Sequence, residues 1–183
     1  MQSTSYADIL NAEEADRARR RHPLRLVLIF LVVFFALQYA WGLSRGTWLE
    51  HVVIDQATVI PAAWIIDQIW PVFHVIPEGH RLIAPMGRLN VLNGCEGLEI
   101  LFLLVAALIA YPFAWRNRWL GIGLGALLVF VLNQARIVIL WHTYLSNRDW
   151  FSALHGTVLP LIMIACCFIF FLAFLSRHGT PDE

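Results

Sequence analysis

The chain has 183 residues, of which 59% are hydrophobic and 14% are charged, and its formal net charge at pH 7 is zero. Soluble domains are typically about 45–50% apolar and about 25% charged, so this composition excludes an ordinary soluble domain and indicates a membrane protein. The balanced charge gives no reason to expect a nucleic-acid partner. The three cysteines, Cys95, Cys166 and Cys167, do not form the framework of a disulfide-rich protein.

The N-terminal part of the chain combines a polar segment with an apolar run. Residues 1–23 are polar, and we expect them to form a cytoplasmic segment. The apolar run Leu24–Leu43 follows the basic cluster Arg17–Arg21, a flank that resembles a signal sequence. Because the run is long and no clear A-x-A cleavage site follows it, we interpret it as a retained anchor. Residues 24–183 then form a single membrane-embedded domain.

The following segment, residues 44–94, is the only sizeable region that we expect outside the membrane. Apolar residues recur at helical spacing in Trp48–Trp70, and Pro61 interrupts the pattern. This predicts two short amphipathic helices lying in the membrane interface. The segments Arg81–Ala84 and Arg88–Leu92 flank a Pro-Met-Gly turn signal, which predicts a small β-hairpin. We expect the segment to cap the outer face of the protein.

Three further apolar runs, Leu98–Trp115, Trp119–Leu145 and Thr157–Leu175, reach the roughly 17–25 residues that a helix needs to span the hydrocarbon. Together with the first run they predict an all-α membrane protein, a four-transmembrane-helix bundle with an outer-face amphipathic helical segment and a small β-hairpin. Basic residues concentrate before the first run and in the loop Trp115–Trp119, which places these parts in the cytoplasm. Four spans then return the C-terminus to the cytoplasmic side.

Arg136 lies inside the third run, where an arginine costs at least about 2.5 kcal/mol on insertion scales. Such a charge usually faces a bundle interior or an aqueous cavity. It is roughly 14 Å below the outer end of its helix at Leu145. Cys95 and His155 come just before the outer ends of the second and fourth runs. Topology therefore predicts that Cys95, Arg136 and His155 share one pocket near the outer interface.

These three side chains suit nucleophilic catalysis by a thiol. A thiolate attacks a carbonyl, while an imidazole accepts the thiol proton and later delivers it to a leaving amine. An arginine can stabilise the oxyanion of the tetrahedral intermediate without titrating. We therefore predict Cys95, Arg136 and His155 as catalytic residues.

Spacing identifies the supporting residues. Glu99 lies four residues after the cysteine, on the same expected helical face, and could pair with the arginine or orient the histidine. Asn133 lies three residues before the arginine and could bind a substrate or hold the guanidinium. Asn93 and Gly94 suit the start of a helix, and Gly94 and Gly97 let backbone approach closely.

Each feature also has an ordinary structural explanation. A cysteine near a helix start is usually structural, and a buried arginine can fix helix register through an ion pair. A non-enzymatic membrane assembly or export factor, with Arg136 as a structural charge, is therefore the alternative function. A disulfide-generating oxidoreductase is not favoured, because only Cys95 faces the outer side. No cofactor or metal is expected, since no metal-ligand spacing occurs among His51, His74, His80 and His142.

Three motifs in order carry a resemblance to a known family. They are Asn93–Gly97 at the start of one span, Asn133-x-x-Arg136-Ile137 within the next, and Leu154–Gly156 at the start of the last. From about Arg88 to Leu175 the chain resembles the exosortase/archaeosortase family. Larger exosortases have more spans than the four predicted here, so the chain resembles the small subtypes, such as those lettered H or M.

The resemblance implies a membrane cysteine transpeptidase of the bacterial inner membrane, with its active site facing the periplasm. The family's catalytic residues correspond to Cys95, Arg136 and His155. The implied substrates are exported, membrane-anchored proteins with a C-terminal sorting tail of the PEP-CTERM type. Such a tail consists of a short recognition motif, one transmembrane helix and a basic cluster. The sequence does not identify the acceptor that resolves the thioester.

Overall fold

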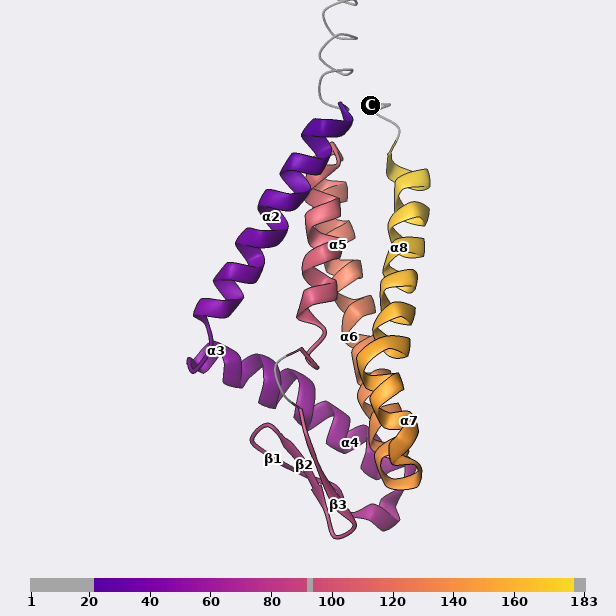
Figure 1. Cartoon of the computed structure of the whole chain (residues 1–183). Helices are drawn as coiled ribbons and strands as arrows, with labels where there is room; N and C mark the ends of the chain where they lie inside the picture. Colours follow the sequence, from indigo (N-terminus) through magenta and orange to yellow (C-terminus); the bar gives the residue numbers. More distant parts are fainter. Residues whose placement is uncertain (1–21, 92–93, 180–183) are drawn as a thin grey trace, which may run out of the picture.

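The computed structural model describes residues 22–91 and 94–179, so residues 1–21 of the predicted cytoplasmic segment and Asn93 lie outside the described residues. The protein is an all-α membrane protein with one small antiparallel sheet (Figure 1). In chain order its elements are α2 (Pro23–Leu43), α3 (Trp48–His51), the π-helical turn η1 (Val52–Val59), α4 (Ile60–Ile69), the 3-10 turn η2 (Pro71–Phe73), β1 (Ile76–Glu78), β2 (Arg81–Ala84), β3 (Gly87–Asn90), α5 (Leu98–Ala110), α6 (Trp115–Ser146), α7 (Arg148–Ala153), the π-helical turn η3 (Leu154–Val158) and α8 (Leu159–His178).

Within the described residues, four helices are long and apolar enough to cross a membrane. They are Pro23–Leu43, Trp48–Ile69, Trp115–Ser146 and Arg148–His178. Three of them correspond to predicted spans, and the protein is therefore a multi-pass membrane protein. The fourth, Trp48–Ile69, is the region that the sequence predicted to lie in the interface. In Figure 1 this helix crosses the ends of α2 and α5 rather than running beside them, so we call it the transverse helix.

The predicted span Leu98–Trp115 is wrong as a single helix. Helix α5 ends at Ala110, because Tyr111 precedes a proline and adopts extended backbone angles, φ −74° and ψ 139°. Its 13 residues reach about 20 Å, which is less than the roughly 30 Å of hydrocarbon. The predicted basic loop at Trp115 is instead the first turn of α6. Irregular backbone therefore continues α5 at both ends, as is tolerated where other parts of the protein bury it.

The transverse helix is continuous, so the prediction of two separate helices broken at Pro61 is wrong. Proline lacks the N–H that would continue the helical hydrogen-bond ladder. The turn before it is π-helical, and the carbonyl of Ala57, four residues before Pro61, accepts a hydrogen bond from Gln134 Nε2 of α6 at 3.3 Å. The proline is thus accommodated, and the freed carbonyl anchors the transverse helix to α6.

The last span also differs from its predicted start at Thr157. The helix begins at Arg148, where the side chain of Asn147 accepts a hydrogen bond from the Asp149 N–H, and it continues through α7, η3 and α8. The π-turn η3 precedes Pro160. His155 consequently lies inside a continuous helix and not in the loop before it.

The outer sheet has the order β1-β2-β3 and is antiparallel throughout. The predicted hairpin is confirmed as β2 and β3, in which Leu82 is opposite Leu89, and β1 adds a third strand that the sequence did not predict. Leu82 and Leu89 are buried in a cluster shared with the transverse helix and α6. A second apolar cluster joins α5, α6 and α8. The sheet and the transverse helix therefore form one outer layer on the membrane bundle.

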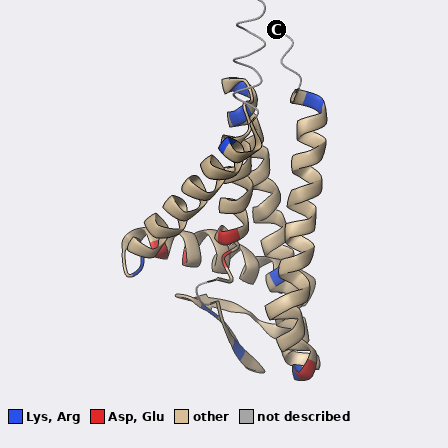
Figure 2. Cartoon of the chain, turned by 45° about the horizontal axis from the view of Figure 1, so that its top comes forward, with Lys and Arg blue, Asp and Glu red and all other residues tan. Residues whose placement is uncertain are grey.

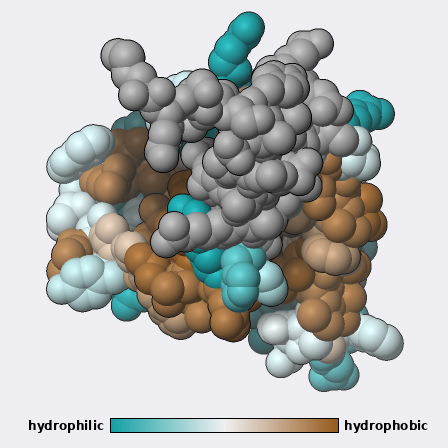
Figure 3. All heavy atoms as spheres, turned by 90° about the horizontal axis from the view of Figure 1, so that it is seen from above, coloured by the Kyte–Doolittle hydropathy of each residue, from teal (hydrophilic) through white to brown (hydrophobic). Residues whose placement is uncertain are grey.

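Charge and hydropathy are distributed as a membrane protein requires. Basic residues gather at the end where α2 and α6 begin and α8 ends (Figure 2), and they include Arg25, Arg116, Arg118 and Arg177. The view onto this end shows hydrophobic surface on the flanks of the bundle (Figure 3). Exposed leucine, valine, isoleucine and phenylalanine side chains of α2, α6 and α8 form these flanks.

Candidate active site

Residues Gly94–Gly97, which we call the cysteine loop, lead into α5. Gly94 and Gly97 have φ angles of +97° and +77°, in the region that favours glycine because it has no Cβ. Gly97 is the N-cap residue of α5, and its carbonyl accepts a hydrogen bond from the Leu101 N–H at 3.1 Å. The two glycines turn the chain so that Cys95 is buried just before the first turn of α5.

Cys95 and His155 are in direct contact. The Sγ atom of Cys95 lies 2.9 Å from Nε2 of His155, although 60 residues separate them in the sequence. The ring of Phe151 lies parallel to the imidazole, with centroids 5.6 Å apart. Cys95 is only 9% exposed. The imidazole is thus within proton-transfer distance of the thiol and is held in place by the aromatic ring.

Arg136 joins the two segments that carry this pair. The side chain is 5% exposed; Nη1 donates to the carbonyl of Gly94 and Nη2 donates to the carbonyl of His155, each at 3.3 Å. Its Nε is buried without a hydrogen-bond partner. Among residues 22–91 and 94–179, no carboxylate forms a salt bridge with it. The guanidinium therefore places a positive charge beside the thiol–imidazole pair.

The π-turn explains why the His155 carbonyl is available to Arg136. In η3 the Leu159 N–H donates to the Leu154 carbonyl, five residues earlier. The next residue, Pro160, has no N–H to give to the His155 carbonyl. The guanidinium supplies a donor where the helix cannot. π-helical turns inside α-helices are frequent at functional sites.

Glu96 fixes the cysteine loop from within, a role that the sequence analysis did not predict. One carboxylate oxygen accepts the indole N–H of Trp41 at 3.1 Å, and the other accepts the Gly94 N–H at 2.5 Å. Trp41 lies near the end of α2, so this carboxylate connects α2 to the loop. No sequence pattern could have found the pair, because 55 residues separate its members.

The predicted supporting residues have different environments. Glu99 is exposed, and within the part of the chain that the structure describes it makes no hydrogen bond or ion pair with Arg136 or His155. Cys95 precedes the helix, so the four-residue spacing does not put it on the helical face of Glu99. Asn133 is buried and packs against Gly97, and its Oδ1 has no hydrogen-bond partner.

Comparison with known proteins identifies a family for the chain. Residues 15–172 match the transmembrane exosortase (Exosortase_EpsH) family. No curated protein and no solved structure gives a significant match. The fold and the site describe a multi-pass membrane protein with a buried cysteine, a half-buried histidine and a buried arginine at one end of its bundle. The chain belongs to the transmembrane exosortase family, whose members are membrane protein-sorting transpeptidases.

The packing of Gly97 against Asn133 gives a testable prediction. A Cβ on Gly97 would lie 3.0 Å from Cγ and Oδ1 of Asn133, and alanine would also be strained at this positive φ by about 1–2 kcal/mol. Gly97→Ala is expected to lower the thermal unfolding temperature in detergent by more than Gly46→Ala does. Gly46 has a similar φ of +73° with nothing within 4 Å, so it isolates the contact with Asn133. Equal effects would contradict the described packing.

Proposed function

We propose that this exosortase-family protein is a cysteine transpeptidase that cleaves the C-terminal sorting signal of exported proteins through a thioester at Cys95. The observation that carries the proposal is the 2.9 Å contact between the Cys95 thiol and the His155 imidazole beside the buried Arg136. We further propose the bacterial inner membrane as its location, with the site on the periplasmic side. The basic residues at the opposite end of the bundle support this orientation, with both termini in the cytoplasm.

In the acylation step, Nε2 of His155 accepts the thiol proton while Sγ of Cys95 attacks the carbonyl carbon of the scissile bond. The tetrahedral intermediate collapses when the imidazolium returns that proton to the leaving amine, which departs with the sorting tail. The product is a thioester between Cys95 and the exported protein. An acceptor amine or water then attacks the thioester, and the regenerated thiol completes the cycle.

Arg136 has two roles in this mechanism. Its two hydrogen bonds hold the Gly94 carbonyl and the His155 carbonyl at a fixed separation, which sets the position of the thiol relative to the imidazole. Its positive charge also favours the thiolate and the oxyanion, and this effect is strongest where water is scarce. Burial of the guanidinium and the lack of an acidic partner among the described residues both support the second role.

The outer sheet is the element that we propose reads the recognition motif as an extended peptide. Its two edges differ. Edge strand β1 contains Pro77, which cannot donate a backbone hydrogen bond and is typical of edges that resist pairing. Edge strand β3 is followed by the cysteine loop four residues after its end. A peptide paired with β3 would therefore run toward Cys95.

The alternative function is a non-enzymatic assembly or export factor. In that case Arg136 would serve only to crosslink the cysteine loop and the last helix through their carbonyls, and the thiol–imidazole contact would have no chemical role. The two functions differ in whether Cys95 forms a covalent bond to a substrate, and this can be measured directly.

The covalent intermediate gives the first test of the proposed mechanism. In membranes that also contain a co-expressed protein with a C-terminal sorting tail, the wild-type chain is expected to form a hydroxylamine-sensitive adduct at Cys95 and to release the tail. Cys95→Ala should abolish both while leaving the protein inserted, because no other side chain replaces the nucleophile. Cys166→Ala is the matched control and should retain both. Tail release by the Cys95→Ala variant would reject the mechanism.

The geometry of Arg136 gives a second test of the proposed mechanism. Lysine keeps the charge but lacks the planar guanidinium, so Arg136→Lys cannot place two separate nitrogens on the two carbonyls. We expect tail cleavage to fall by about 10²-fold or more, the usual effect of losing a donor that stabilises an oxyanion. Substrate-tail cleavage should be timed in membranes with equal amounts of each variant. Turnover close to that of the wild type would show that the paired contacts are dispensable.

A further inference from the structure

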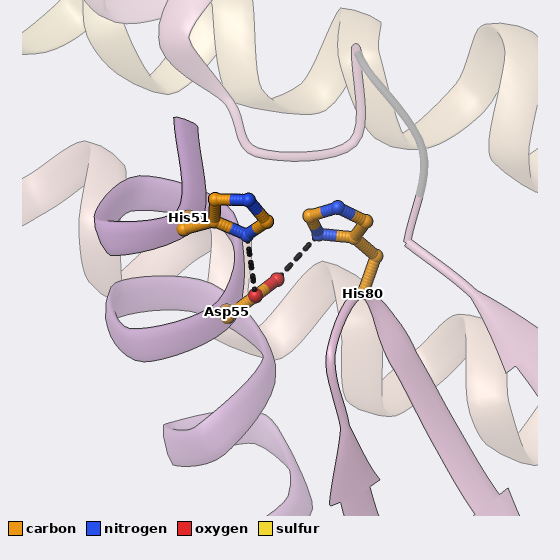
Figure 4. A group of neighbouring side chains, drawn as sticks. All are labelled: His51, Asp55 and His80. Carbon is orange, nitrogen blue, oxygen red and sulfur yellow. Dashed lines mark hydrogen bonds and ion pairs between the residues drawn. The ribbon is translucent and has the colours of Figure 1, made fainter. Parts of the chain in front are cut away.

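A second cluster of polar side chains lies in the outer layer, apart from the cysteine loop. His51 ends α3, Asp55 lies in η1, and His80 occupies the turn between β1 and β2 (Figure 4). Nδ1 of His51 lies 3.1 Å from one carboxylate oxygen of Asp55, and Nδ1 of His80 pairs with the other. The imidazoles are close to parallel, with centroids 5.4 Å apart. The two rings thus present the same nitrogen to one carboxylate.

The ligand set of this cluster suits a transition-metal ion. One ligand atom from each residue lies within 4.8 Å of the other two, so small side-chain rotations would bring all three around a single ion. Two imidazole nitrogens and one carboxylate are ligands that Zn²⁺ and related divalent ions accept. The side chains of His51 and His80 are 59% and 39% exposed, so an ion could enter from solvent and keep a water as its remaining ligand.

An ion bound at this cluster would have a structural role, because the cluster joins two parts of the outer layer. The sheet has strands of three and four residues, and all three residues of β1 are exposed, so apolar burial holds the β1–β2 turn in place only from the β2 side. Strands this short are marginal without additional support. The cluster connects this turn to the transverse helix. The His80 carbonyl also accepts a hydrogen bond from the Val91 N–H at 2.8 Å, which ties the turn to the chain that enters the cysteine loop.

We propose that His51, Asp55 and His80 bind a divalent transition-metal ion of the zinc type, which fastens the β1–β2 turn to the transverse helix. No metal site was expected from the sequence, because the spacing among the histidines alone does not fit one. The signal was the spacing of four residues between His51 and Asp55, which is typical of ligands on one helical face. His80 comes from a distant turn, and only the fold brings it to them.

The test uses the full chain in detergent with the Cys95→Ala substitution, which removes the thiol ligand of the catalytic site. Zinc should be titrated against a chromophoric chelator. We expect one equivalent to bind per chain, and His51→Ala or His80→Ala to weaken its affinity by at least about tenfold. The matched control is His74→Asn, an exposed histidine of the same layer whose φ of +45° asparagine tolerates, and it should bind as the parent does.

A second readout separates lost binding from lost folding. Zinc should raise the thermal unfolding temperature of the parent, because a ligand that binds only the folded state stabilises it, and should not raise that of His80→Ala. His80→Cys retains a ligand atom and should restore both binding and the shift. The proposal would be overturned if the parent showed no saturable zinc binding, or if both alanine variants bound zinc with unchanged affinity. His51, Asp55 and His80 would then only join the turn to the transverse helix through their direct contacts.

Discussion

The site depends on the two hydrogen bonds from Arg136 to the backbone carbonyls of Gly94 and His155. A guanidinium at bilayer depth is costly unless polar groups surround it. Here the carbonyls that accept hydrogen bonds from the guanidinium belong to Gly94, the residue before Cys95, and to His155. The interaction that stabilises the buried charge therefore also brings the thiol and the imidazole together. Any change that frees either carbonyl would both expose the charge and separate the reacting groups.

Interruptions of the helices supply the polar groups that this arrangement needs. Pro160 removes an N–H from the last helix, and the guanidinium uses the carbonyl left behind. Pro61 has the same effect on the transverse helix, where Gln134 donates to the Ala57 carbonyl. Two polar residues of α6, Gln134 and Arg136, thus each donate to a carbonyl within a π-turn, that of Ala57 in η1 and that of His155 in η3. Helix α6 is the continuous element from which the site and the outer layer are both positioned.

Much of the fold could be predicted from the sequence, because long apolar runs and a turn signal depend on residues close together in the chain. The membrane class, three spans, strands β2 and β3, and the meeting of Cys95, Arg136 and His155 followed from hydropathy and topology. Continuity of the helices through Pro61 and Pro160 did not, since it requires side-chain donors from α6. The roles of Trp41 and Glu96 depend on a contact between distant residues. Glu99 was assigned by helical spacing, which fails because the chain is not helical at Cys95.

The most direct measurement is the rate at which a small, membrane-impermeant thiol reagent alkylates Cys95 in intact spheroplasts. If the thiol, imidazole and guanidinium share a site on the periplasmic side, Cys95 will react from outside, and Cys166 and Cys167 will not. The rate will fall in His155→Ala, because the imidazole no longer accepts the thiol proton. Labelling only from the cytoplasmic side, or a rate that His155→Ala leaves unchanged, would contradict the account.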